Sequence, residues 1–277
     1  MTIDKRLHAV RGDLADARLQ GTVDAARFVA GRPARVTIGV LPLKEAPRWE
    51  ALLSTELFFG DAVTVFEEKD GWAWLQAEAD DYVGYAPLDG VETGAGPAPT
   101  HRVTALATFL YAEPDLKSMP LDSLPLGADL TLSGEEQGTF RGVCGEGWVF
   151  APHVTPLDAL SGDFVKEAER FLGIPYLWGG KSSRGIDCSG LVQAALRAVG
   201  SAAPRDTDMQ AKDLGSAAHR NAPRRRGDLL YFPGHVGIAT DAATLLHANA
   251  RSMTVASEPL ADVIARLGLP VSVRAIR

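Results

Sequence analysis

Cys188 stands where a helix is predicted to begin. Asp187 before it is a good helix cap, and the apolar spacing of CSGLVQAALRAVG is typical of a helix that ends at Gly200. The first turn of a helix offers unpaired N–H groups and a positive dipole end, and both favour a thiolate, the nucleophilic form of cysteine. Cys188 is therefore a candidate nucleophile. The alternative is a buried structural cysteine, the common fate of a lone one.

The surroundings of the two cysteines differ. The loop before Cys188, GGKSSRGID, is rich in glycine and has no large apolar residue, so we expect it to leave the sulfur accessible. Cys144 lies in FRGVCGEGWVF, a strand-like segment without a helix start, and is expected in the core. Two cysteines cannot form a disulfide framework, and these two lack the spacing of a metal site.

A nucleophilic thiol needs a base and a group that orients the base. Four of the six histidines lie in presumed tail, linker, exit or charged-loop segments, whereas His235 and His247 lie on two neighbouring predicted strands, GHVGIAT and LLHAN. A turn centred on Asp241 would place His235 directly opposite His247 in an antiparallel pair, with Cβ atoms about 4.5–5.5 Å apart. Spacing alone leaves open whether the cysteine and the two histidines form a nucleophile–base–orienter set or a fortuitous one.

The strand that begins at His235 has two different faces. Val236 and Ile238 are expected to point into a core. His235, Gly237 and Ala239 leave the other face nearly bare, which makes room for a substrate or a facing helix.

The elements that carry these residues lie in the last part of the chain. Two further helices are predicted in DFVKEAERFLG and DTDMQAKDLG, the second with Asp206 as its N-cap. Strands are predicted in DLLYF, HVGIAT, TLLHAN and VSVRAI. Helices followed by an antiparallel sheet are typical of an α+β domain.

The preceding chain is predicted to form two small β-barrels, at 35–93 and 101–157, joined by the linker GAGPAPT at 94–100. The second segment repeats the first loosely: VTALATFLYAEP matches VTIGVLPLKEAP, and GWVFAP matches VGYAP. Both segments resemble bacterial SH3-like domains. Residues 1–34 fit neither segment, and DLADARLQGTVDAARFV is predicted to form a helix that packs on the first barrel.

Composition limits the classes of partner. A net charge of −7 argues against nucleic acid or an anionic membrane surface as the main partner. The basic run at 224–226 is interpreted as a solvated loop, with contact to a carboxylate-rich substrate as the alternative. No apolar run is long enough to span a membrane, and no secretory signal is visible. We therefore expect a cytoplasmic protein, although a secreted one trimmed of its signal would look the same.

Residues 161–277 resemble the NlpC-type cell-wall cysteine peptidases (the NlpC/p-sixty family). The matching segments are GIPYLWGGKSSRGIDCSGLVQAAL, RRGDLLYFPGHVGIA and LLHANA, in the family's order. The resemblance implies a multidomain chain of two SH3-like β-barrels followed by a papain-like α+β catalytic domain. It implies that Cys188 is the nucleophile, His235 the base and His247 the orienter.

The same resemblance implies further site residues. Tyr176 would line the site near the oxyanion, and Asp187 and Ser189 would help to bind substrate. The segment PRDTDMQ resembles a family segment near the substrate, which makes Asp206 or Thr207 a candidate contact.

The activity implied is hydrolysis of the γ-D-glutamyl–L-diamino acid amide bond in murein peptides, by a cysteine mechanism that needs no metal or organic cofactor. Relatives with two SH3-like domains act on small muropeptides, and their first SH3-like domain reads a free N-terminal L-alanine. Tyr82 and Glu56 resemble the residues that do so, although Tyr82 is equally interpreted as an ordinary exposed strand aromatic.

Two other functions are weighed against this one. The first is another cysteine-dependent amidase or acyltransferase on the same scaffold. The second is a non-catalytic wall-binding protein that acts through its SH3-like domains. The intact set of Cys188, His235 and His247 argues against the second, because a binding module needs none of them.

Overall fold

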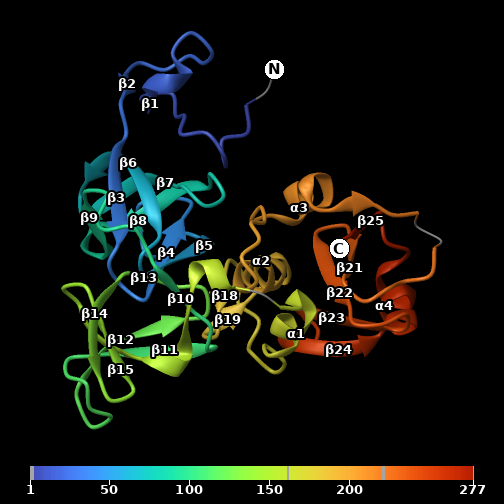
Figure 1. The fold of residues 1–277 in the computed structure, drawn as a ribbon. Helices are drawn as coiled ribbons and strands as arrows, with labels where there is room; N and C mark the ends of the chain where they lie inside the picture. Colours follow the sequence, from blue (N-terminus) through green and yellow to red (C-terminus); the bar gives the residue numbers. More distant parts are fainter. Residues whose placement is uncertain (1–2, 161, 220–221, 277) are drawn as a thin grey trace. The chain divides into compact units, whose positions relative to one another are not determined.

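The computed structural model describes residues 3–160, 162–219 and 222–276 (Figure 1). The chain divides into two compact units, Met1–Asp158 and Ala159–Arg277. Residue 1, where the predicted N-terminal segment starts, lies outside the described residues. So do residues 161 and 277, which bound the predicted peptidase domain. None of the helices described is both long and apolar enough to cross a membrane.

A seven-stranded antiparallel sheet forms from residues 32–93, in the order β5-β4-β8-β7-β6-β3-β9. Its strands are β3 (Arg32–Val36), β4 (Val40–Lys44), β5 (Leu53–Phe58), β6 (Ala62–Lys69), β7 (Trp72–Ala77), β8 (Val83–Pro87) and β9 (Val91–Thr93). Asp70 and Gly71 join β6 to β7 with φ of 50° and 79°, as a tight hairpin turn requires. An Asp-Gly pair is typical of such a turn.

Residues 101–156 repeat this strand order in two smaller sheets, β12-β11-β16-β15-β14 and β13-β10-β17. The strands are β10 (His101–Val103), β11 (Ala107–Tyr111), β12 (Pro120–Pro125), β13 (Asp129–Leu130), β14 (Leu132–Gln137), β15 (Phe140–Val143), β16 (Gly147–Phe150) and β17 (Val154–Pro156). Together β13 and β14 take the place that β6 has in the first sheet. Phe58 and Phe59 of the first segment pack with Leu110, Leu124 and Val149 of the second in one core cluster.

The N-terminal residues do not form the predicted helix. Described residues 3–34 contain β1 (Ala15–Asp16), β2 (Phe28–Val29), a single 3₁₀ turn (Ala17–Leu19) and the first residues of β3. Backbone donors here pair with distant parts of the segment: the Ala15 amide donates to Arg27 O and the Asp16 amide to Ala9 O. Leu14 packs with Ala9 against the aromatic rings of the first sheet. These tertiary contacts outweigh the helical spacing, while packing on the first sheet is as expected.

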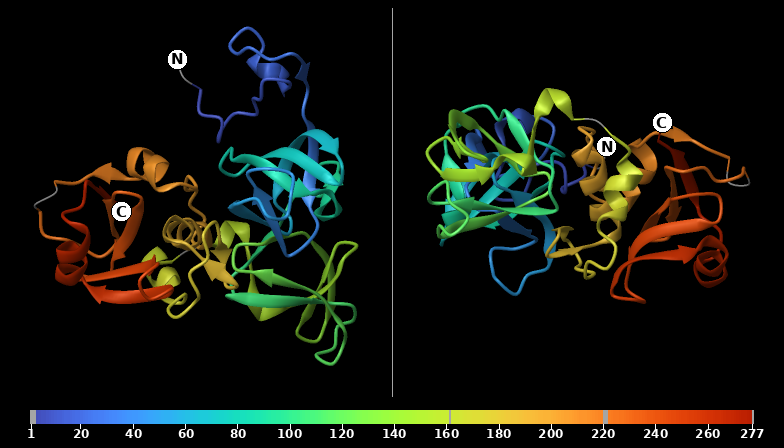
Figure 2. Two further views of the ribbon diagram at one scale, coloured as in Figure 1. Left: turned by 180° about the vertical axis from the view of Figure 1, so that it is seen from behind. Right: turned by 60° about the horizontal axis from the view of Figure 1, so that its bottom comes forward.

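The second unit is a six-stranded sheet with helices on both sides. The sheet order is β20-β25-β21-β22-β23-β24. The strands are β20 (Ser216–Ala217), β21 (Asp228–Phe232), β22 (His235–Ala239), β23 (Thr244–Asn249), β24 (Thr254–Pro259) and β25 (Ser272–Ala275), with a small hairpin of β18 (Lys181–Ser182) and β19 (Gly185–Ile186) outside it. The helices are α1 (Phe164–Glu169), α2 (Cys188–Ala198), α3 (Thr207–Asp213) and α4 (Leu260–Leu267). Figures 1 and 2 show α2 and α4 on opposite sides of the sheet.

The bare face predicted for β22 is covered by a helix. Val236 and Ile238 are fully buried, as expected. On the other face, Ala239 belongs to a core cluster that includes Val263 of α4, and a Cβ added at Gly237 would meet the Leu245 side chain at 2.6 Å. Of the two alternatives for this face, the structure shows the facing helix.

Candidate active site

The nucleophile candidate stands at the first residue of α2. Asp187 is the N-cap, and its Oδ1 accepts a hydrogen bond from the Gly190 amide at 2.7 Å. The backbone amides of Ser189 and of Val236, the second residue of β22, lie close enough to the Cys188 sulfur to favour its thiolate form. These contacts place the sulfur between the start of a helix and the start of a strand.

The protonation of Cys188 differs from the expectation. Burial, reinforced by the charge of Asp187, raises the pKa of the thiol to about 11, although the two amides act in the opposite direction. The residue is 7% exposed, so the sulfur is neither the accessible nor the ionised one that the sequence suggests. Burial outweighs the helix start because desolvation penalises the charged form. Cys144, expected in the core, is only half-buried.

The two histidines meet through their rings. His235 Nε2 lies 2.8 Å from His247 Nδ1, and the ring centroids are 5.0 Å apart. The predicted register is wrong by two residues, because the strands pair Ile238 with Leu246 and so centre the turn on residue 242 instead of 241. This register brings Gly237 opposite His247. The histidines are diagonal neighbours on one face, which side chains of their size can span.

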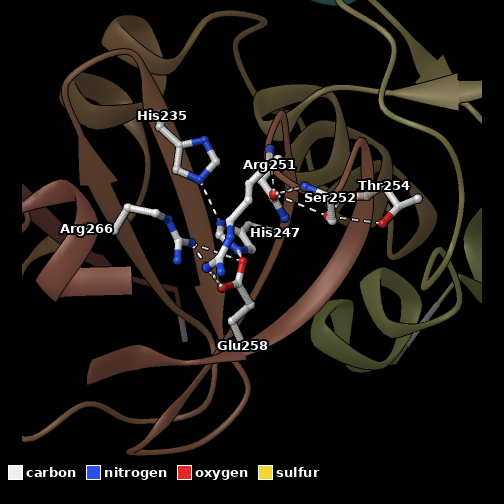
Figure 3. Close-up of polar contacts among 8 residues, drawn as sticks. His235, His247, Arg251, Ser252, Thr254, Glu258 and Arg266 are labelled. Carbon is white, nitrogen blue, oxygen red and sulfur yellow. Dashed lines mark hydrogen bonds and ion pairs between the residues drawn. The ribbon is translucent and has the colours of Figure 1, made fainter. Parts of the chain in front are cut away.

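The contacts continue beyond His247 (Figure 3). His247 Nε2 lies 3.0 Å from Glu258 Oε1 on β24. Arg266 of α4 donates to both carboxylate oxygens, at 3.1 and 3.0 Å, and Arg251 lies 3.5 Å from Oε2. The His247 side chain is 1% exposed, so the chain of contacts from His235 to Glu258 passes through a buried ring.

The His235 ring is unprotonated at neutral pH, so one of its nitrogens has a free lone pair. Burial, with the neighbouring His247 next, lowers its pKa to about 4, so the imidazole is neutral. Its Nε2 is occupied by His247, which leaves Nδ1 as the nitrogen for a thiol. Among the residues described, no hydrogen bond joins the His235 ring to Cys188. The amide of Val236 is the link from β22 to the sulfur, so the role of His235 as base stays a prediction.

A buried arginine binds the residues before and after the nucleophile. The Arg205 guanidinium donates to Asp187 Oδ1 and Oδ2, at 3.0 and 2.7 Å, and to Ser189 Oγ at 2.9 Å. Asp187 Oδ2 also accepts from the Gly179 amide at 2.8 Å. In this structure Asp187 and Ser189 thus make their hydrogen bonds inside the protein. Their predicted part in substrate binding is untested.

The other candidates of this unit precede and follow Cys188 in the sequence. Burial and the charge of Cys188 raise the pKa of Tyr176 to about 12, so its phenol is protonated and lies within electrostatic reach of the sulfur. Asp206 precedes α3 and Thr207 begins it, but the Asp206 side chain makes no capping hydrogen bond.

The buried Tyr231 hydroxyl, which was not among the predicted site residues, has no hydrogen-bond partner within the described residues. Burial, and also the charge of Cys188, raise the pKa of Tyr231.

Tyr82 and Glu56 belong to the first unit. Tyr82 directly precedes β8 and is 7% exposed, which contradicts the interpretation as an exposed strand aromatic. Glu56 lies on β5 opposite Pro42 and is 5% exposed. Their predicted role in reading the substrate's N-terminus stays a prediction.

Four further residues of the site were not predicted: Glu258, Arg266, Arg205 and Gln210. Gln210 is fully buried, and its Nε2 donates to Ser189 O at 3.0 Å. The signal for α4 is present in LADVIARLG, whose apolar residues follow helical spacing up to Gly268. Across residues 3–160, 162–219 and 222–276, no group of three or more His, Cys, Asp or Glu side chains is arranged to hold a metal ion.

Two family models match parts of this chain. The sequence model of the NlpC/P60 family matches residues 173–266, which include the cysteine and both histidines. A second model, the bacterial dipeptidyl-peptidase Sh3 domain, matches residues 43–91.

Relatives extend over most of the chain. A gamma-D-glutamyl-L-lysine dipeptidyl-peptidase of Bacillus subtilis is 29% identical over 238 residues, which are 77% of this chain and 78% of the relative. A dipeptidyl-peptidase 6 of Lysinibacillus sphaericus is 27% identical over 225 residues, 73% and 82% of the two chains. The crystal structure of an NlpC/P60 family protein from Bacillus cereus covers 87% of this chain and 98% of its own, with a TM-score of 0.76 at 20% identity. This last likeness shows a shared fold.

Proposed function

Since the chain carries a cysteine peptidase domain of the NlpC/P60 family, we propose that it hydrolyses the γ-D-glutamyl–L-diamino acid amide bond of murein peptides in cell-wall turnover or recycling. The observation that carries the proposal is Cys188 at the start of α2 beside β22, whose first residue His235 is bonded to His247. Support for the substrate comes from relatives named gamma-D-glutamyl-L-lysine dipeptidyl-peptidase, which match about three quarters of the chain.

The mechanism starts from a neutral pair. His235 takes the Cys188 proton at Nδ1, and the thiolate attacks the γ-glutamyl carbonyl carbon. The oxyanion forms near the Cys188 amide and the protonated phenol of Tyr176. The imidazolium then gives its proton to the leaving amine of the diamino acid. Water, deprotonated by His235, hydrolyses the thioester and restores the thiol.

The first unit is proposed to select the substrate. The strand order shared by residues 32–93 and 101–156 supports two SH3-like domains in this unit. Glu56 would pair with the ammonium of a free N-terminal L-alanine, a charge-assisted contact worth about 1.5–3 kcal/mol, and Tyr82 would add an apolar edge. Acetylation of the substrate removes that charge and should lower kcat/KM by about tenfold or more. Equal rates on free and acetylated peptides would contradict this selection.

The reaction is tested by mass spectrometry of the products from L-Ala-γ-D-Glu-L-Lys and from the diaminopimelate peptide. We expect L-Ala-γ-D-Glu as one product. Cys188→Ala and His235→Ala should abolish turnover without unfolding the chain. His247→Ala should leave a weak hydrolysis rate, and Cys144→Ala should hydrolyse the peptides at the wild-type rate. Cleavage of other amides with these peptides intact would indicate a different amidase. Wild-type hydrolysis by Cys188→Ala would refute the mechanism.

A further inference from the structure

The hydrogen bonds that run from His235 through His247 end at the carboxylate of Glu258. Glu258 Oε1 is 3.0 Å from His247 Nε2, and Arg266 binds both carboxylate oxygens from α4 (Figure 3). Burial acts to raise the pKa of Glu258, but the hydrogen bonds from His247 and Arg266 outweigh it and the pKa is lowered. Glu258 is therefore a carboxylate at neutral pH.

The carboxylate decides which nitrogen of His247 carries the proton. An ionised carboxylate can only accept hydrogen bonds, so Nε2 of His247 must be the donor in the 3.0 Å contact. Burial lowers the pKa of His247 although Glu258 acts against it, so the ring is neutral and has one proton only. Nδ1 of His247 is then an acceptor.

The same reasoning passes to His235. Since His247 Nδ1 accepts, His235 Nε2 must donate across the 2.8 Å contact. The neutral His235 ring then has its lone pair on Nδ1. That atom must be unprotonated if His235 is to take the proton of Cys188.

We propose that Glu258, held by Arg266, is a positioning residue that fixes the tautomers of His247 and His235, so that Nδ1 of His235 is free to act as the base. The inference rests on the proposed cysteine mechanism. Glu258 acts through His247. Its removal lets His247 carry its proton on Nδ1 and donate to His235 Nε2, which moves the His235 proton to Nδ1, where it blocks proton transfer from the thiol.

The first measurement needs no activity. ¹⁵N NMR of the histidine side chains distinguishes protonated from unprotonated ring nitrogens. We expect His235 and His247 of the wild-type chain, near pH 7, to carry their protons on Nε2. A proton on Nδ1 of His235 in the wild type overturns the proposal, whether or not the chain cleaves γ-D-glutamyl peptides.

The second measurement is kinetic, with Glu258→Gln as the near-isosteric variant. A neutral amide can donate as well as accept, so it no longer enforces one tautomer. We expect kcat to fall at least about tenfold with KM within about twofold, since loss of the group that orients the base in a serine peptidase triad costs up to about 10⁴-fold. Glu258→Asp, which keeps a carboxylate, should recover part of the rate.

Two controls separate positioning from a merely structural role. Glu169→Gln also removes a carboxylate that pairs with an arginine of this unit, Arg226 at 2.9 Å. In the described part of the chain, Glu169 is not hydrogen-bonded to His235 or His247, so this variant should leave kcat unchanged. Combined with His247→Asn, Glu258→Gln should add little further loss, because its effect passes through the His247 ring. Wild-type kcat in Glu258→Gln, or a full additive loss in the double variant, overturns the proposal. If the wild type cleaves no γ-D-glutamyl peptide, the proposed function fails while the NMR result still decides this inference.

Discussion

Replacement of Arg205 by methionine should destabilise the second unit strongly. Arg205 and Asp187 side chains are 1% and 9% exposed, and the guanidinium binds both carboxylate oxygens. Methionine fills much of the same volume but leaves the Asp187 charge without its cation. Breaking a buried ion pair on one side typically costs about 3–5 kcal/mol. The amides of Gly179 and Gly190 still bind Asp187, so we expect the lower end of that range, about 3 kcal/mol.

A loss of about 3 kcal/mol should lower the Tm of a domain of this size by about 10–15 °C. Calorimetry of the full chain gives the size of the effect. Hydrogen exchange followed by mass spectrometry locates it, since peptides from α2 should lose protection while peptides from β7 in the first unit should not. The matched control is Arg226→Met, because Arg226 pairs with Asp163 and Glu169 at 2.8 and 2.9 Å but is 40% exposed. Exposed pairs of this kind contribute about 0–1 kcal/mol.

A double variant tests the cause. Asp187→Asn removes the charge that Arg205→Met leaves unpaired, so the two changes together should cost less than the sum of the single effects, by about 0.5–3 kcal/mol. Additive losses, or a shift for Arg205→Met no larger than that for Arg226→Met, would refute the reasoning.

Three further predictions concern protonation. Iodoacetamide should label Cys188 more slowly than the half-buried Cys144 at pH 7. The rate of Cys188 labelling should increase as the pH rises toward the thiol's pKa of about 11. Rapid labelling at pH 7, with a rate that stops rising at low pH, would show that Cys188 is a thiolate. The acid limb of kcat/KM should lie near pH 4, the lowered pKa of His235, because only the neutral ring is a base; a limb at the ordinary histidine value near 6.5 would contradict burial as the cause. Between pH 6.5 and 4 the unfolded chain binds a proton at His235 that the folded chain does not. The free energy of unfolding should therefore fall by about 3 kcal/mol as the pH drops through that window. Urea titrations of His235→Gln should show a smaller fall.

The sequence by itself determined the local helices and strands of the second unit and the candidate residues Cys188, His235 and His247. The spacing of apolar residues after Asp187 and the glycine stop predicted α2, and short apolar segments predicted β21, β22, β23 and β25. These patterns suffice because they reflect which face of one element is buried. The order of Cys188, His235 and His247 within family motifs was likewise readable without a structure.

Only the tertiary structure decided how these residues are coupled. The hydrogen bond from His247 to Glu258 joins residues 11 apart on neighbouring strands, and that from Arg205 to Asp187 joins residues 18 apart across loops. The diagonal register of the two histidines depends on where the β22–β23 turn is centred. A shift of two residues keeps every side chain on its face, so the strand patterns do not fix it. The thiol's raised pKa depends on burial by residues from several elements, and the N-terminal segment lost its helix to contacts with the first sheet. Such properties arise from groups that chain folding brings together, so no local spacing contains them.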